Sequence, residues 1–291
     1  MAALMTKTEW LASTIARLQQ NDPTLTNIQR IGDVHLAIAE LLTEEDGVAL
    51  ADALVGNTHV TSITIKGSNI LDIGGAAIAN ALKDNRTVTS IVLRNNGFVP
   101  HDATSHWVTG TAIAAISELL QVNNTVTELN LRGNDLADAG IVVLCEGLKV
   151  NTSIKTLNLE YTDMGNAGVA ALAAMLRVNQ SIKTLAIGCN DYSVACLAIL
   201  EESLKNNFTL LECFVDYWYN AQAINTILIR NMTPSWSVHK HKTFDTQCHM
   251  TIMATLMSAN KATSEKTLPR MLPELWEGHI FPHFKPRIMD L

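Results

Sequence analysis

The sequence predicts a curved α/β solenoid, a right-handed arc with parallel strands on its concave face and helices on its convex face. Two observations predict it. A segment recurs every 28 residues over most of the chain, and each recurrence contains a short alternating apolar stretch followed by a helical pattern. One strand–loop–helix unit cannot bury its own apolar face, so such units must stack on their neighbours.

An asparagine opens each unit and sets the register of the repeat. The spacing between these asparagines is 28 residues, except for one spacing of 38. They are Asn57, Asn85, Asn123, Asn151, Asn179 and Asn207. Each is followed by an alternating stretch such as SITIKGSNI or ELNLRGNDL, which is typical of a half-buried strand. Aliphatic residues at helical spacing come next, for example Leu144 with Leu148 and Leu172 with Leu176.

A second asparagine follows the strand in three units, at Asn96, Asn134 and Asn190. Its amide can hydrogen-bond the turning backbone of the adjacent coil and satisfy polar groups inside the stack. Ser68 and Thr162 take this position in two other units, with less reach. In the loop before each helix, Asp72, Asp138 and Asn166 are expected to cap the helix that follows them.

We divide the chain into three parts. Residues 1–21 are expected to form a capping helix, in which Thr6 and Glu9 have the spacing of a capping box. Residues 22–231 form a solenoid of about seven repeats, with an insertion at 98–110 in the unit that is ten residues too long. Residues 232–291 form a C-terminal extension of different composition, rich in histidine and proline.

The 28-residue pattern is identified as the leucine-rich repeat of ribonuclease-inhibitor type. The phrase NDPTLTNI, the long first helical region and the aromatic last strand TLLECFVDYWY together resemble the leucine-rich-repeat domain of tropomodulin. This resemblance covers about residues 5–231. It implies the solenoid architecture and, as one functional alternative, an actin-filament regulator.

Composition limits the classes of function. The formal net charge of −7 gives no support to nucleic-acid or anionic-membrane binding. The N-terminal segment has no apolar run of the length of a signal peptide, and the five cysteines form no paired framework, so we expect a reduced, cytoplasmic protein. The sequence has no phosphate-binding glycine loop, HExxH motif or GxSxG elbow, so we expect no enzyme and no cofactor.

The C-terminal extension offers a second functional alternative. Its phrase LPELWEGHIF resembles the opening of an F-box, which implies a substrate adaptor of a ubiquitin ligase. The commoner interpretation is that its apolar residues dock onto the rest of the chain. Metal binding is disfavoured at both histidine groups, because their spacing matches no standard zinc module. These groups are His101, Asp102 and His106, and His239, His241, Cys248 and His249.

The strand register defines the candidate binding face, since residues between the buried aliphatics point away from the core. The second outward position gives three cations, Lys66, Arg94 and Arg132, followed by Glu160, Gly188 and Asp216. Tyr161 and Tyr217 lie beside its far end. Like charges on neighbouring strands repel, so we predict a protein partner with an acidic segment.

The insertion at 98–110 is a second candidate contact, because insertions in repeat proteins map to surface loops. Its Trp107 is either a recognition residue or a side chain that packs back onto the solenoid. The oligomeric state and the identity of the partner are left open.

Overall fold

The computed structural model describes residues 6–31, 41–97 and 110–215, together with residues 224, 227, 228 and 231. The chain divides into two units, residues 1–228 and 229–291, and the description below concerns the first. Trp107, Asp216, Tyr217 and the F-box-like phrase lie outside the described residues.

Strands and helices alternate throughout the described residues of this unit. The elements are α1 (Lys7–Gln19), β1 (Asn27–Ile31), α2 (Glu44–Leu54), β2 (Ser62–Lys66), α3 (Leu71–Ala81), β3 (Ser90–Arg94), α4 (Thr111–Val122), β4 (Glu128–Asn130), α5 (Ala137–Val150), β5 (Thr156–Asn158), α6 (Asn166–Leu176), β6 (Thr184–Ala186), α7 (Val194–Leu204) and β7 (Glu212–Phe214). The strands form one parallel sheet in sequence order.

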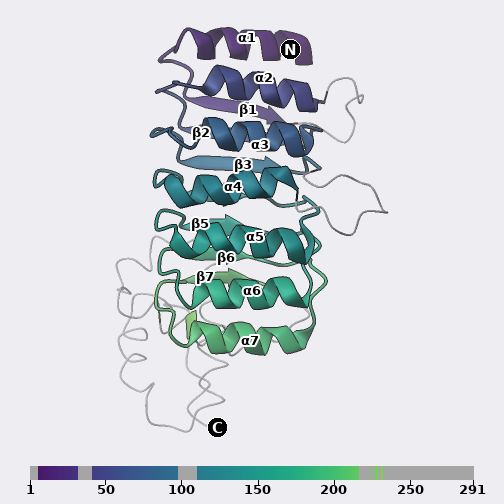
Figure 1. Ribbon diagram of the computed structural model, residues 1–291, viewed down its shortest axis with the longest axis vertical. Helices are drawn as coiled ribbons and strands as arrows, with labels where there is room; N and C mark the ends of the chain where they lie inside the picture. The colour runs from purple at the N-terminus through teal and green to yellow at the C-terminus, as the bar shows by residue number, and fades with distance from the viewer. Residues whose placement is uncertain are drawn as a thin grey trace, which may run out of the picture. The chain divides into compact units, whose positions relative to one another are not determined.

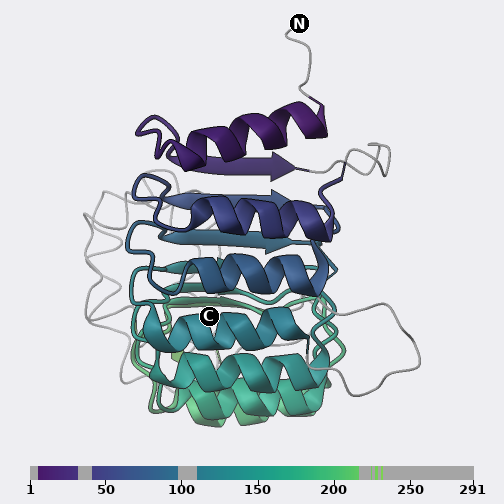
Figure 2. The ribbon, with the colours of Figure 1, turned by 45° about the horizontal axis from the view of Figure 1, so that its top comes forward.

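The helices lie side by side on one face of this sheet, as Figures 1 and 2 show. Strands pack about 4.8 Å apart, whereas packed helices need about 8–10 Å, so a stack with one helix per strand curves with its strands inside. The predicted α/β solenoid is therefore confirmed. The helical aliphatics that predicted it, including Leu144, Leu148, Leu172 and Leu176, are fully buried in one continuous core.

The predicted asparagine ladder is confirmed at Asn134, which is completely buried. Its side-chain nitrogen donates to the carbonyl of Leu93 in the preceding coil at 2.7 Å and to that of Leu131 at 2.8 Å. Its side-chain oxygen accepts from the Asn96 backbone N–H at 2.9 Å. One side chain thus satisfies three backbone groups in two coils.

The asparagines that open the units form a second ladder, which the sequence used only as register marks. Asn151 is representative. Its amide nitrogen donates to the Asn123 carbonyl at 3.1 Å, and its oxygen accepts from the backbone N–H of Ser153 and Ile154. Asn85, Asn123, Asn179 and Asn207 make the same bond to the unit before them. These bonds align the opening asparagines of successive units, across the 38-residue spacing between Asn85 and Asn123 as well as across the spacings of 28 residues.

The N-terminal helix covers the first coil as expected. The Thr6 hydroxyl accepts from the Glu9 backbone N–H, and the Glu9 carboxylate accepts from the Thr6 N–H, which completes the predicted capping box. Leu18 is buried in the core, and Trp10 packs against it.

The predicted helix caps are wrong in one respect: the side chains cap the helix of the next repeat. Asp138 lies inside the first turn of α5 and accepts from the backbone N–H of Gly165 at 2.8 Å and of Gly168 at 2.6 Å, at the start of α6. Asn166 likewise accepts from the Ser193 N–H at the start of α7. The Asp138 and Asn166 side chains point to the neighbouring repeat, so the backbone groups that they cap belong to the next helix.

Asp72 makes the same contact with α4, where its carboxylate accepts from the Ala112 N–H. A Cβ atom on Gly110 would lie 2.5 Å from the Asp72 carboxylate, so any other residue at position 110 would displace this carboxylate. Burial, partly offset by the Ala112 bond, raises the pKa of Asp72 to about 6.

Replacing Asn134 with alanine should lower the free energy of unfolding by about 1–3 kcal/mol, because the backbone groups it satisfies stay buried without partners. For a solenoid of this size the melting temperature should fall by several degrees, at about 2–4 °C per kcal/mol. The matched control is Asn124→Ala, which removes an exposed asparagine. A melting temperature within about one degree of the parent for Asn134→Ala would contradict the ladder at this position.

The variant Asp72→Asn tests the cap that the half-buried Asp72 carboxylate forms at the start of α4, through the pH dependence of the free energy of unfolding. The folded pKa of Asp72 is raised, so the folded state holds this proton more tightly than the unfolded state between about pH 4 and 6. Lowering the pH from 7.5 to 4.5 should therefore stabilise the parent relative to Asp72→Asn, by on the order of 1 kcal/mol for a half-buried group. Urea unfolding at both pH values measures this difference. The exposed Asp52→Asn should show no such change, and a pH-independent difference for Asp72→Asn would contradict the assignment.

Candidate protein-binding face

The parallel register arranges outward side chains in columns that run across the sheet. Ser62 pairs with Ser90, Thr64 with Val92, and Lys66 with Arg94. The sheet face opposite the helices is therefore a set of columns with one residue per repeat. Four of the predicted site residues that the structure describes occupy the column at the carboxyl ends of the strands: Lys66, Arg94, Arg132 and Glu160.

Lys66 and Arg94 are immediate neighbours in this column. Their backbones also bond one residue further on, where the Gly67 N–H donates to the Arg94 carbonyl at 2.9 Å. Both side chains are half-buried. No carboxylate of the described residues lies within ion-pair distance of either cation. The Arg94 Nε atom is buried and has no hydrogen-bond acceptor in the described part of the chain.

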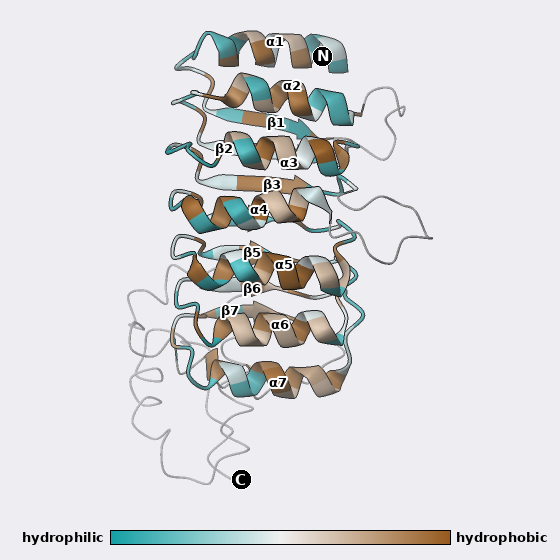
Figure 3. Cartoon of the chain, viewed as in Figure 1, coloured by the Kyte–Doolittle hydropathy of each residue, from teal (hydrophilic) through white to brown (hydrophobic). Residues whose placement is uncertain are grey.

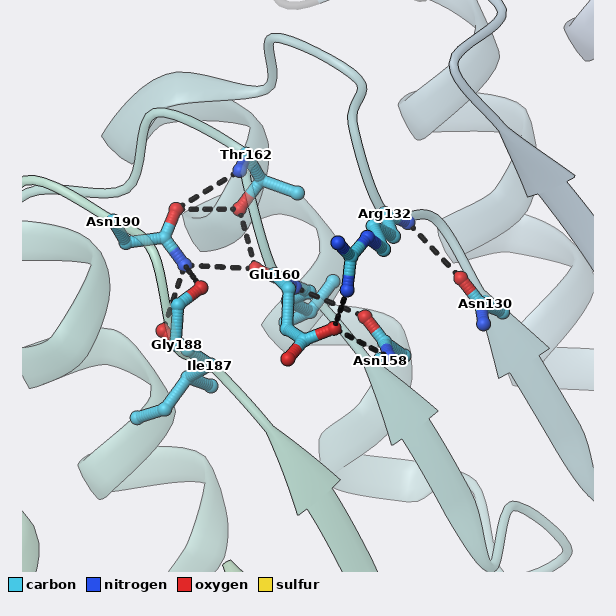
Figure 4. Close-up of polar contacts among 9 residues, drawn as sticks. Asn130, Arg132, Asn158, Glu160, Thr162, Ile187, Gly188 and Asn190 are labelled. Atoms are coloured by element: carbon cyan, nitrogen blue, oxygen red, sulfur yellow. Dashed lines mark hydrogen bonds and ion pairs between the residues drawn. The ribbon is translucent and has the colours of Figure 1, made fainter. Parts of the chain in front are cut away.

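The third predicted cation, Arg132, has a different environment. Its guanidinium forms an ion pair with the carboxylate of Glu160, its neighbour in the next repeat (Figure 4). The guanidinium carbon also lies 4.6 Å from the centre of the Tyr161 ring, in a cation–π contact. Glu160 therefore neutralises Arg132 within the protein, whereas the sequence pattern grouped Arg132 with Lys66 and Arg94 as a cation for an acidic partner. An opposite charge at the same register position of the next repeat is the reason.

Two asparagines hold this ion pair in place, as Figure 4 shows. The Asn130 side chain accepts from the Arg132 backbone N–H at 3.1 Å, and the Asn158 side chain accepts from that of Glu160 at 3.0 Å. The Asn158 amide also donates to the Glu160 carboxylate at 3.2 Å. Strands β4 and β5 end here, and these bonds fix the backbone from which both charges project.

Tyr161 projects from this cluster into solvent. It has a left-handed backbone conformation with φ 53°, and its side chain is 51% exposed. A hydrogen bond with the Cys189 thiol is the main cause that raises the pKa of Tyr161, so its hydroxyl stays protonated. With Arg132 on its ring and Cys189 at its hydroxyl, the aromatic side chain is held before any partner arrives.

The far end of the face is smaller and more apolar. Gly188 occupies the next position of the column and has no side chain, and Ala186 lies close to it, in β6. Phe214 pairs with Ala186 in register and is 54% exposed. The sequence prediction missed Phe214, although the outward position between Cys213 and Val215 was the available signal.

An acidic row follows the face at the loops after β4, β5 and β6. It consists of Asp135, Asp163 and Asp191, all exposed. The pKa of Asp163 is raised. The largest cause is the loss of solvent around its carboxyl group, followed by the neighbouring carboxylates of Asp135 and Asp191. The candidate face therefore changes from cationic at Lys66 and Arg94 to acidic and aromatic beyond Arg132.

The described residues contain neither a metal-binding cluster nor a membrane-spanning helix. No group of three or more histidine, cysteine or acidic side chains there is arranged to hold a metal ion. No helix among them is long and apolar enough to cross a membrane.

Comparison with known proteins supports the repeat directly. A family model described as Leucine Rich repeat matches residues 122–145 and 150–173. A search of curated proteins finds no match at significant similarity.

Three solved structures are similar to this chain. One is the yeast Rad7 and Elc1 complex, with a TM-score of 0.52, 14% identity and coverage of 76% of this chain and 51% of that chain. The others are leiomodin-1 actin-binding site 2, with 18% identity, and the tropomodulin C-terminal domain of Caenorhabditis elegans, with 13%. Both have a TM-score of 0.34 and cover 77% of this chain, and they are matched over 90% and 95% of their own lengths.

The chain spans about half the length of the Rad7–Elc1 chain that it matches, and that likeness concerns the fold. The two segments matched by the family model are successive turns of one stack. Because that stack continues in the same register on both sides, the described residues form a leucine-rich-repeat solenoid.

Proposed function

We propose that this protein is a non-enzymatic binding module that holds a protein partner on the exposed face of its sheet. The partner presents an acidic segment to Lys66 and Arg94 and apolar or hydrogen-bonding groups to Tyr161 and Phe214. Repeat solenoids use such extended faces for binding, which supports a scaffold role over a catalytic one.

The uncompensated pair Lys66 and Arg94 carries this proposal. Two like charges about 5 Å apart repel by roughly 1 kcal/mol in water, and by more where they are half-buried. For Arg132, in the repeat after Arg94, the Glu160 carboxylate of the following repeat supplies the opposite charge. A carboxylate from a partner would do so for Lys66 and Arg94 and would give the buried Arg94 Nε an acceptor.

The second half of the face supplies an ordered aromatic contact. Tyr161 is held by Arg132 and Cys189, so a partner loses little side-chain entropy by binding it. In the proposal, this half of the binding face also includes Arg132, Glu160, Asp216 and Tyr217. Trp107 in the insertion at 98–110 is proposed as an additional contact beside the face.

The two alternatives from the sequence remain predictions. The F-box-like phrase lies outside the described residues, and the actin-regulating alternative rests on resemblance to tropomodulin. Pull-down with a ubiquitin-ligase scaffold and co-sedimentation with filamentous actin test them separately. A cytoplasmic location is part of the proposal and is tested by fractionation of cells.

Replacing both cations with glutamate, in the double variant Lys66→Glu with Arg94→Glu, should weaken partner binding by at least tenfold. The reason is that attraction between opposite charges becomes repulsion between like charges at the proposed contact. Affinity purification with the parent and the variant first identifies proteins that depend on these two residues. Binding of the purified partner is then measured at several salt concentrations. The variant should show a flatter salt dependence and a nearly unchanged melting temperature.

The control is Lys83→Glu with Arg86→Glu, which makes the same change in net charge just after α3. It also removes the ion pair of Lys83 with Glu118, so its melting temperature is measured alongside. This control should retain the affinity of the parent. If both variants bind the purified partner equally well, the contact does not lie at Lys66 and Arg94.

A further inference from the structure

The layer of helices extends one helix further than the sheet at the N-terminal end of the solenoid. Each strand from β1 to β6 is followed by the helix of its own unit, as β1 is followed by α2. Helix α1 continues the helix layer past β1 (Figures 1 and 2), and among the described residues no strand precedes it. Strand β1 is therefore the outermost strand at this end, and a helix projects beyond it.

Contacts at both ends of α1 give it the position of a repeat helix. Near its start, the Lys7 ammonium forms an ion pair at 3.0 Å with the carboxylate of Asp46, in the first turn of α2. After its end, the Asn21 side chain donates to the Thr58 hydroxyl at 3.0 Å and accepts from the Thr58 backbone N–H at 3.1 Å. Helices α1 and α2 are therefore parallel neighbours, like successive helices along the rest of the stack.

The outer edge of β1 consists of the backbone groups of Asn27, Gln29 and Ile31. In a parallel sheet, alternate residues of a strand bond opposite neighbours. The Thr26 carbonyl accepts from the Ser62 N–H of β2 at 3.4 Å, so Thr26 and every second residue after it bond β2. The N–H and C=O groups of the residues between them point away from the sheet. None of these groups has a hydrogen-bond partner in the described part of the chain.

The equivalent backbone groups of β3 bond the strand before it. The Ser90 N–H donates to the Thr61 carbonyl at 3.3 Å, and the Arg94 carbonyl accepts from the Gly67 N–H at 2.9 Å. Edge strands are commonly protected by charged side chains, proline or a bulge. Strand β1 pairs with β2 at all five of its positions without a bulge, and the side chains that it exposes are uncharged. Its outer edge is therefore open to a further strand.

Side chains of α1 define what a strand beside β1 would contact. Trp10, Leu11 and Ile15 are only partly buried where they pack against the core, and Figure 3 shows hydrophobic bands along α1. The Trp10 ring lies over β1, with the Arg30 guanidinium carbon 5.7 Å from its centre. Successive side chains of a strand point to opposite faces, so every second residue of an added strand would face α1. Those positions favour apolar residues, and the residues between them would lie beside the uncharged side chains of β1.

We propose that the outer edge of β1 binds an extended segment of another protein, which adds a strand to the sheet and places apolar residues under α1 at every second position. The edge presents both N–H donors and C=O acceptors. An extended main chain satisfies both, whereas the main chain of a helix is already bonded internally.

A second copy of this chain fits the edge less well, because it brings its own helices. An added strand lies about 4.8 Å beyond β1, whereas a packed helix such as α1 lies about 8–10 Å beyond its neighbour α2. Two copies paired through β1 would need the same space for their α1 helices. A single strand without a helix layer avoids this overlap.

The test uses the full chain and a fluorescent, uncharged peptide of about seven residues, in which threonine and valine alternate. Fluorescence anisotropy should show saturable binding. Alternate N–H groups of a strand point to opposite edges, so N-methylation of only the valines or only the threonines blocks one edge of the peptide at a time. One of these two peptides should bind at least tenfold more weakly, and the other should bind like the unmodified peptide. A peptide with serine in place of every valine should also bind at least tenfold more weakly, because it loses the apolar contact with α1.

Two substitutions at Gln29 separate the contribution of its backbone from that of its side chain. Gln29→Pro removes an N–H group that bonds nothing in the described part of the chain, and proline is tolerated at such edge positions. This variant should bind the peptide at least tenfold more weakly, whereas Gln29→Val keeps the N–H group and should bind like the parent. The double variant Lys66→Glu with Arg94→Glu should also bind like the parent, which separates this contact from the one proposed for the strand face.

Absence of peptide binding by the full chain would overturn the proposal, as would an equal effect of the two methylation patterns. Unchanged binding by a Gln29→Pro variant that melts like the parent would also overturn it. A dimer in analytical ultracentrifugation that Gln29→Pro abolishes would instead identify a second copy of this chain as the occupant. If Gln29→Pro does not fold, the two methylated peptides still decide whether the contact is made by main-chain hydrogen bonds.

Discussion

Backbone polar groups buried between stacked coils must find hydrogen-bond partners, and the rest of this structure depends on how they do so. Water does not reach them, and a parallel sheet satisfies only the groups within its short strands. Buried asparagine side chains supply hydrogen-bond partners for backbone groups beyond the strands, both before the strands begin and after they end. Asn134 and Asn151 each bond their own turn and the coil before it. This double bonding sets the spacing and register of the coils, and with them the alignment of every outward side chain.

Strict register brings equivalent residues of successive repeats together whatever their charge. Where the residues are Arg132 and Glu160, the result is an ion pair that also holds Tyr161. Where they are Lys66 and Arg94, the result is an uncompensated pair of cations. Both arrangements have the same backbone geometry. The difference between the part of the face with an internal ion pair and the part with two unpaired cations therefore lies in single side chains.

The same stacking gives the two edges of the solenoid different chemistry. Helix N-termini attract carboxylates, and here those carboxylates come from the preceding repeat, as Asp138 shows at the start of α6. The capping side chains therefore join neighbouring repeats as well as stabilising single helices. At the opposite edge, helices α4 and α5 end with the exposed side chains of Val122 and Val150.

Periodicity alone determined the solenoid, the buried ladder position of Asn134 and the shared column of Lys66 and Arg94, because a strict repeat dictates which residues occupy equivalent places. It did not determine which neighbours those residues contact. Only the tertiary structure showed that the Glu160 carboxylate pairs with Arg132 and that the Asp138 carboxylate caps the next helix. It also showed that the Phe214 side chain is exposed on the face. The physical reason is that these contacts cross between coils, where side-chain direction and the chemistry of the adjacent repeat decide the partner.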